Sequence, residues 1–257
     1  MRVWSGGMVQ ELLIIFTALL LGGALKGATG MGTPVVAVPA LAAFFDVPFA
    51  IAVLIVPVLL TNAWQAWQFR AHWTGLSFLP RLLASAVVGI AAGTWLLTTL
   101  PTNLLSLGLG GTTLLYIAVR LFRPELMIGP TAARRWAPVA GVLAGGLQGA
   151  TGVSAPVSVT FINGMRLSRP QFVLTVSTLF LAFVLTQIPA LTLAGVLTSE
   201  RALFSAAALF PVAAGMPIGG WAARRLSPQA FDRLILVLLA GIAMKLFWDA
   251  GLFGPAW

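Results

Sequence analysis

The chain has 257 residues, of which 59% are hydrophobic and 8% are charged, and its mean hydropathy is +0.99. Soluble domains carry about 25% charged residues, so this sequence has too few polar side chains to cover a globule in water. We therefore expect an all-α integral membrane protein. At about 20 apolar residues per spanning helix, a chain of this length with short loops holds about eight membrane-depth segments.

Several kinds of chemistry are excluded by residues that the sequence lacks. No cysteine is present, which removes disulfides, thiolate catalysis and thiolate metal sites. One histidine and six scattered acids are too few to build hydrolytic or metal chemistry, so we expect no enzyme activity, no metal and no cofactor. The net charge of +9 is interpreted as membrane topology and not as binding to nucleic acid, because Lys and Arg gather in the cytoplasmic loops of membrane proteins.

The apolar runs follow one another with short connections. Those long enough to cross a membrane are residues 8–27, 49–69, 76–98, 104–121, 172–193, 202–222 and 231–253. Shorter runs, typical of half-helices, are residues 33–45, 137–149 and 156–163. The first run lacks a basic flank and a cleavage site, so it is expected to be a retained helix and not a signal peptide.

An internal repeat relates the two halves of the sequence. Residues 25–35 and 147–157 are identical at seven of eleven positions, at a constant offset of 122. The motif Gly-x-x-x-Gly also recurs, at 89–93 and 215–219. The predicted organisation is a first transmembrane repeat at 1–122, a basic cytoplasmic connection at 123–136 and a second transmembrane repeat at 137–257.

The repeated segment is expected to interrupt a helix. It reads Gly-Ala-Thr-Gly in both halves, at 27–30 and 149–152, and a proline follows four residues later. Glycine costs about 1 kcal/mol relative to alanine in a helix interior, and proline about 3 kcal/mol. Unwound backbone at membrane depth is tolerated only where protein or a water-filled cavity receives its polar groups. Two such breaks, each followed by a half-helix whose N-terminus is positive, predict a central anion site.

The arginines decide between two ways of threading the broken segments. In one, each segment crosses the membrane once; in the other, it forms a hairpin that returns to its own side. The hairpin arrangement places nine arginines on one side and only Arg2 and Arg201 on the other, whereas single crossings divide them seven to four. The positive-inside rule therefore favours hairpins. With three further crossings in each half, the two repeats are inverted and both termini are extracytoplasmic.

These features resemble the TauE/SafE sulfite exporter family over nearly the whole chain. The resemblance rests on the paired glycine-rich segments that end in proline, on the duplicated halves and on the stretch at 51–73. The first half keeps the glycines and proline of the family, whereas the second has Ser154 and Ala155 where further glycines are usual. The resemblance implies a transporter in the bacterial inner membrane for small anions, commonly sulfite, sulfonates or other small organosulfur or carboxylate anions.

The candidate substrate site consists of residues at the two breaks and two amides in the helices that follow. Its members are Lys26, Gly27, Thr29, Gly30, Gly32, Asn62, Gln148, Gly149, Thr151, Gly152, Ser154 and Gln187. Lys26 is the one fixed charge in the repeated motif. It is expected to pair with the anion, unless its long side chain extends to the membrane surface.

Hydroxyl groups and glycines in this set each have two interpretations. The hydroxyls of Thr29, Thr151 and Ser154 can donate to an oxyanion, but the two threonines can also bond to carbonyls of their own helices. Glycines let helices approach closely, and packing is the interpretation for the Gly-x-x-x-Gly motifs at 89–93 and 215–219.

We expect a transporter in which the two halves rock around an anion bound at the breaks. Carboxylates are the usual intramembrane proton carriers, and the central segments have none, so coupling through a carboxylate is not expected. A channel-like anion pore and a non-transporting membrane scaffold are the alternatives. The expected partners are a small anion and the lipid bilayer, and a homo-oligomer remains open.

Overall fold

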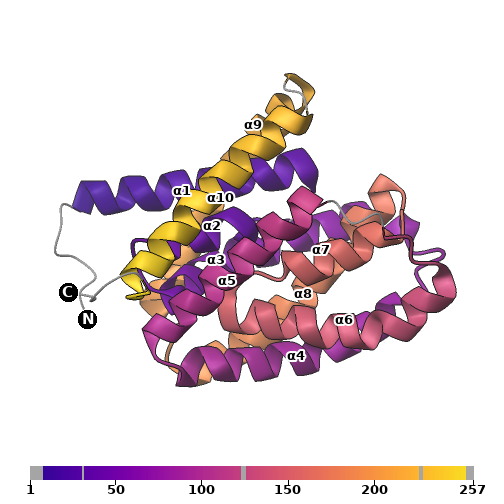
Figure 1. Cartoon of the computed structure of the whole chain (residues 1–257), viewed down its shortest axis with the longest axis horizontal. Helices are drawn as coiled ribbons and strands as arrows, with labels where there is room; N and C mark the ends of the chain where they lie inside the picture. The colour runs from indigo at the N-terminus through magenta and orange to yellow at the C-terminus, as the bar shows by residue number, and fades with distance from the viewer. Residues whose placement is uncertain (1–7, 31, 123–125, 226–227, 253–257) are drawn as a thin grey trace.

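The computed structural model describes residues 8–30, 32–122, 126–225 and 228–252, and every regular element within them is a helix. The first half contains α1 (Met8–Thr29), α2 (Pro34–Ala42), α3 (Val47–Gln68), the short 3-10 helix η1 (Arg70–His72), α4 (Leu79–Thr99) and α5 (Thr102–Phe122). The second half contains α6 (Pro130–Thr151), α7 (Ala155–Gly164), α8 (Arg169–Leu193), α9 (Ser199–Arg225) and α10 (Pro228–Asp249). The expected all-helical architecture is confirmed (Figure 1).

Most of the described helices are long enough to cross a bilayer. Six of them, α1, α3, α4, α5, α8 and α9, are also apolar enough to do so, which identifies a multi-pass membrane protein. By contrast, α2 has 9 residues and α7 has 10, so both are too short to cross. The short helices predicted at 33–45 and 156–163 are therefore confirmed.

The third predicted half-helix, at 137–149, is wrong. This segment belongs to α6, which begins at Pro130 and has 22 residues. Arg134 and Arg135 lie exposed on its first turns, so the helix starts earlier than the apolar run does. Part of the predicted connection at 123–136 is thus helical. Arg2 and Arg123, which entered the charge count, lie outside the described residues.

Both long helices that precede a half-helix end at a glycine with a left-handed backbone. Gly30 has φ +73° and Gly152 has φ +74°, and each donates its N–H to the carbonyl four residues earlier at 2.8 Å. Only glycine adopts this conformation without a steric cost, which is why it ends helices. A proline stands in the first turn of each following helix. The helix breaks predicted from the repeated motif are confirmed.

One end of the molecule collects most of the arginines. Three hydrogen bonds join its segments: Gln171 to the Thr74 carbonyl at 2.9 Å, the Ile128 N–H to the carbonyl of Gly164 at 2.8 Å, and Arg81 to a backbone carbonyl of α6 at 3.3 Å. We call this the basic end. Because α6 begins here and α7 ends beside Ile128, the short helix α7 returns to the end from which α6 started.

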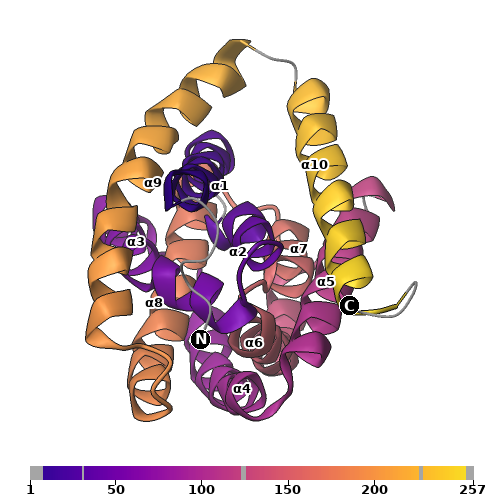
Figure 2. The same ribbon diagram turned by 90° about the vertical axis from the view of Figure 1, so that its left-hand side faces the viewer.

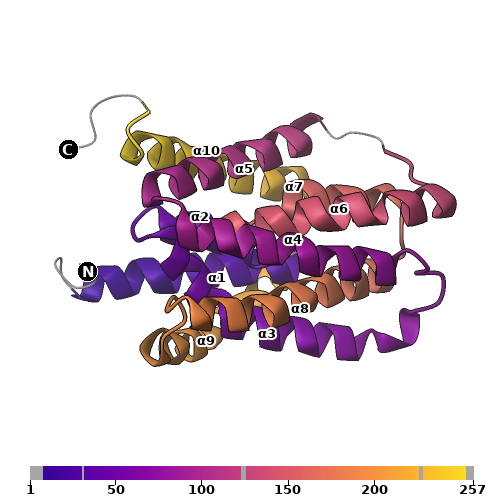
Figure 3. The same cartoon turned by 90° about the horizontal axis from the view of Figure 1, so that it is seen from below.

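The opposite end brings together the α2–α3 turn, the start of α9 and the end of α10. There the Arg201 guanidinium lies over the Phe49 ring, 5.8 Å from its centroid, and the Lys245 ammonium lies 5.3 Å from the Phe44 centroid. Figures 1 and 3 show α1 beginning and α10 ending at this end. The short helix α2 therefore also returns to the end at which its preceding helix began.

Two helix pairs join the halves through glycines, and in each pair the backbones touch. A Cβ on Gly23 of α1 would overlap the backbone of Val212 in α9, and one on Gly219 of α9 would overlap Ala24. We call this contact the α1–α9 seam; Figure 2 shows the two helices side by side. Gly23 meets Val212 and Gly27 meets Met216, so the residue numbers of the contacts increase together along α1 and α9. The two helices are therefore parallel.

The α4–α6 seam is built in the same way. A Cβ on Gly89 would overlap Val142, and one on Gly93 would overlap the carbonyl of Gly146. The helices are again parallel, but they start at the basic end, whereas α1 starts at the opposite end. The packing interpretation of the Gly-x-x-x-Gly motifs at 89–93 and 215–219 is confirmed.

The seams predict how substitutions of glycine affect stability. Gly93→Ala forces backbone apart in the α4–α6 seam and should lower the free energy of unfolding by about 1–3 kcal/mol, as overpacking does. Gly111→Ala is the control, because a Cβ there meets nothing within 4 Å, and alanine favours helix. Thermal unfolding in detergent micelles measures both. Equal melting temperatures for the two variants would contradict the seam.

Candidate functional site

A buried lysine stands beside the first break. Lys26 lies in the last turn of α1, only 1% of its surface is exposed, and its Nζ donates to Oδ1 of Asn62 in α3 at 2.8 Å. The alternative that this side chain extends to the membrane surface is therefore wrong. The ammonium is held inside the protein.

The residue that accepts this hydrogen bond, Asn62, is neutral. Among the described residues the one salt bridge joins Lys245 and Asp249, far along the chain. Burying an ammonium costs several kcal/mol even after the protein relaxes. The negative end of the α1 dipole returns about 0.3–1 kcal/mol at a helix terminus, and so does not offset that cost. Lys26 thus has no acidic partner among the described residues to offset this cost.

Asn62 belongs to a group of polar residues that we call the first polar cluster: Lys26, Asn62, Gln65 and Ser177. The Asn62 amide donates to the Val58 carbonyl at 2.7 Å, which fixes its oxygen toward Lys26. One turn further along α3, the Gln65 oxygen accepts from the Ser177 hydroxyl of α8 at 3.1 Å. All four side chains are buried, so the cluster joins residues from both halves inside the protein.

A second polar cluster, formed by Gln148, Gln187 and the carbonyls of Gly149 and Gly152, lies at the second break. The Gln148 amide donates to the Gly152 carbonyl at 3.0 Å, and the Gln187 amide to the Gly149 carbonyl at 3.4 Å. These bonds satisfy backbone groups that the break exposes. Gln148 is related to Lys26 by the offset of 122. The second cluster is therefore neutral where the first is charged.

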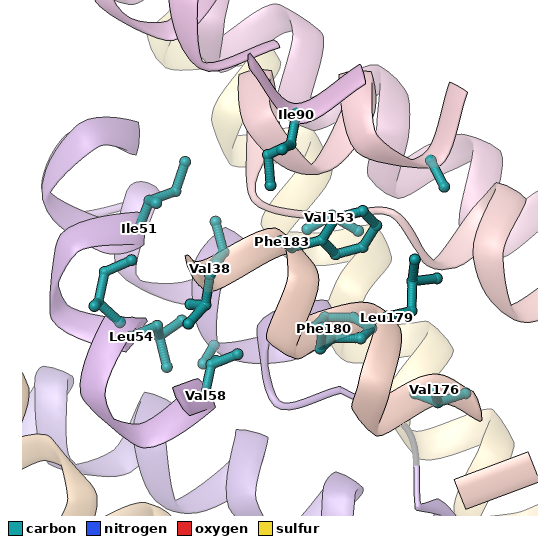
Figure 4. Packing of buried hydrophobic residues seen from close by; sticks show 14 of the residues in the cluster. Val38, Ile51, Leu54, Val58, Ile90, Val153, Val176, Leu179, Phe180 and Phe183 are labelled. Carbon is teal, nitrogen blue, oxygen red and sulfur yellow. The ribbon is translucent and has the colours of Figure 1, made fainter. Parts of the chain in front are cut away.

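A small cavity lies between the second cluster and α3. Its volume is about 20 Å³, and Gln148, Gln187 and Pro34 line it together with apolar side chains. Figure 4 shows four of these, Val38, Ile51, Leu54 and Val58, from α2 and α3. A water needs about 10–15 Å³ of such space, so the cavity is large enough for one water and too small for an oxyanion. The described residues around the second break therefore leave no room for a substrate in this conformation.

The two threonines of the repeated motif bond to their own helices. Thr29 donates to the Leu25 carbonyl and Thr151 to the Leu147 carbonyl, both at 2.8 Å. Of the two interpretations, back-bonding is the one the structure shows. In the second half, Ser154 accepts a bond from Ser158 at 3.2 Å.

Thr33 is a further candidate for the substrate site that the sequence did not single out. It is 1% exposed, it precedes the first turn of α2, and its hydroxyl has no partner among the described residues. A threonine directly before a half-helix normally caps the helix, and this position was the available signal. Without that cap bond, the hydroxyl is a buried polar group that a ligand can satisfy.

The glycines of the candidate site have different surroundings. Gly27 lies in the α1–α9 seam and Gly149 in the α4–α6 seam, so both are in contact with the backbone of another helix. A Cβ on Gly30 would lie 2.9 Å from Val173, and one on Gly152 would lie 2.9 Å from Ile51. A Cβ on Gly32 would lie 2.6 Å from the ring of Phe180. Each break is therefore packed tightly against the other half of the chain.

Comparison with known proteins assigns a family to the chain. The family model described as Sulfite exporter TauE/SafE matches residues 14–246, from within α1 to within α10. Comparison with curated proteins and with solved structures gives no significant match.

Stability separates a functional lysine from a structural one. Lys26→Met removes a buried charge but keeps an unbranched side chain, so we expect an equal or higher melting temperature. Asn62→Leu leaves the ammonium without its acceptor and should cost about 1.5–3 kcal/mol. Thermal unfolding in micelles compares both variants with the parent. A large loss of stability in Lys26→Met would show that the lysine holds the fold together.

Proposed function

Because the chain belongs to the TauE/SafE sulfite exporter family, a family of membrane transporters, we propose that it carries sulfite, or a small organosulfonate, across the bacterial inner membrane. At the level of the family it is a membrane transporter of sulfur anions and not an enzyme. The substrate site in this proposal lies at the first helix break and uses the ammonium of Lys26.

The buried ammonium is the observation that carries the proposal. A sulfur oxyanion supplies the negative charge that Lys26 does not find in Asn62. The unpartnered hydroxyl of Thr33 and the positive N-terminus of α2 follow directly on the other side of the break. These groups are donors, as an oxyanion requires.

Tight packing at the second break supports alternating access. The cavity of about 20 Å³ there does not admit the substrate, so in this proposal the anion crosses when the halves move relative to each other. In this proposal α1–α5 and α6–α10 are inverted repeats, each opening with a hairpin that returns to its own side. The opposite directions of the two seams support this arrangement.

The positive-inside rule then gives the orientation. The basic end carries Arg70, Arg81, Arg134, Arg135, Arg166 and Arg169, and it is the cytoplasmic end in this proposal. In this proposal the start of α1 and the end of α10, which lie at the opposite end, face away from the cytoplasm.

Two other functions make different demands on the same residues. A channel-like pore requires a wetted path, which a cavity of about 20 Å³ at the second break does not provide in this conformation. A membrane scaffold requires no charge in its interior, whereas Lys26 is buried at a cost in stability. A pore could use the same half-helix N-termini, whereas a scaffold does not require the pair of helix breaks.

Flux into liposomes tests the proposal. The parent should take up sulfite with saturable kinetics. In Lys26→Gln the new side-chain amide can still donate to Asn62, but the positive charge is lost. Glutamine is also the residue at the equivalent position of the second half, Gln148. We expect a loss of about 1.5–3 kcal/mol of anion binding, which is roughly a ten- to hundredfold rise in KM.

The control for this experiment is Lys245→Gln, which removes an exposed lysine paired with Asp249 and should leave KM unchanged. Sulfite flux that does not saturate would identify a pore. A folded parent with no flux for sulfite or organosulfonates would identify a scaffold.

The orientation is tested separately with single cysteines, which the natural chain lacks. Ser168 and Thr198 are exposed residues directly before α8 and α9, at the two ends of the molecule. In intact cells a membrane-impermeant maleimide should label Thr198→Cys, and should label Ser168→Cys only after the membrane is opened. The reverse pattern would contradict cytoplasmic placement of the basic end.

A further inference from the structure

A large polar hollow opens at the basic end, between the last turns of α1 and α5 and the α7–α8 turn. Its volume is about 360 Å³, and its polar lining residues are Thr29, Arg120, Asn163, Arg166 and Arg169. We call this hollow the vestibule. We propose that the vestibule is a second binding site, which captures the sulfur oxyanion from the cytoplasmic side and delivers it to Lys26. The inference rests on the proposed function.

The charge of the vestibule selects for anions. Three arginines line it and no acidic residue does, among the residues that the structure describes. The side chains of Arg166 and Arg169 are exposed and have no hydrogen-bond or ion-pair partner among those residues. A guanidinium offers two parallel donors to an oxyanion, a geometry that sulfite and sulfonates match as phosphate and carboxylate do. The Asn163 amide adds a neutral donor.

The backbone at Arg166 shows that the charge is not placed there for the fold. Its φ is +49°, just after the end of α7, where glycine is the usual residue. A left-handed backbone costs an L-residue about 1–2 kcal/mol. Stability alone would favour glycine at this position, so the guanidinium serves something other than the helix end.

The vestibule leads to the first break. Thr29 forms part of its wall and lies three residues after Lys26, which is about 4.5 Å along the axis of α1. Phe172 also lines the vestibule and packs against an apolar cluster that includes Leu25, Val35 and Val36, from both sides of the break. The wall of the vestibule therefore includes the last turn of α1, the turn that also carries Lys26.

A second basic hollow at the same end lacks this connection. Arg81, Arg134 and Arg135 line it, its volume is about 490 Å³, and no residue of either break takes part. This second hollow provides a matched control, because it lies at the same end of the molecule as the vestibule, is lined by the same number of arginines and has a similar volume.

The closing experiment compares the two hollows. Sulfite uptake is measured in inside-out and right-side-out membrane vesicles for the parent, for Arg166→Gln/Arg169→Gln and for Arg134→Gln/Arg135→Gln. The first double variant should raise KM about tenfold in one vesicle orientation only, as lost electrostatic capture does, and kcat should stay unchanged. Its KM should also depend less on ionic strength. The control variant should match the parent.

An anionic lipid headgroup has the same chemistry as the oxyanion, and liposome composition separates the two. In liposomes of phosphatidylcholine alone, the rise in KM should persist. A rise that needs added phosphatidylglycerol would show that the vestibule holds a lipid and would overturn the inference.

A labelled cysteine gives an independent test that does not depend on the arginines. Asn163→Cys is modified in detergent with a maleimide carrying a sulfonate, or with one of similar size carrying an amine, and is then reconstituted. The negative adduct should raise KM for sulfite and the positive adduct should not. Equal effects of both adducts, or a KM for Arg166→Gln/Arg169→Gln equal to that of the parent, would overturn the vestibule. A parent without saturable flux would overturn the proposed function itself.

Discussion

Helix backbones can touch only where no side chain stands between them, and this protein meets that condition twice, each time between its two halves. In the α1–α9 seam and the α4–α6 seam, glycines on both helices meet the backbone of the partner. The last seam glycines, Gly27 and Gly149, lie three residues before the glycines that end α1 and α6. Each seam therefore ends beside a helix break, so the packing of the two halves holds in place the polar groups that follow.

The breaks share a backbone frame but not a charge. Gly30 packs against Val173 and Gly152 against Ile51, and these two contacts are related by the same offset of 122 that relates the sequences. The frame repeats because the same packing is required on both sides. Lys26 and Gln148 break the equivalence, so one break is positive and the other neutral. In the proposed mechanism the free energy of anion binding comes mainly from the first half.

Composition and local spacing predict the all-helical membrane fold, the two helix breaks and the packing glycines, because each follows from transfer free energy or from backbone conformation within a few residues. The start of α6 was missed because hydropathy reports transfer to lipid, whereas Arg134 and Arg135 are helical and exposed. The partner of Lys26 is 36 residues away in α3, and only tertiary packing selects it. The same holds for the vestibule, where Arg120 at the end of α5 meets Arg166 and Arg169 of the α7–α8 turn.

A neutral partner suits the exchange of ligands that the proposed cycle assigns to Lys26. Asn62 is held by its own helix through the Val58 carbonyl, so its oxygen stays available whether or not an anion is present. In the proposed cycle the ammonium bonds to the Asn62 oxygen when the site is empty and to the oxyanion when it is filled. It is never without an acceptor, which keeps the empty protein stable enough to change conformation. A carboxylate in place of Asn62 would bind the ammonium more strongly and would compete with the substrate.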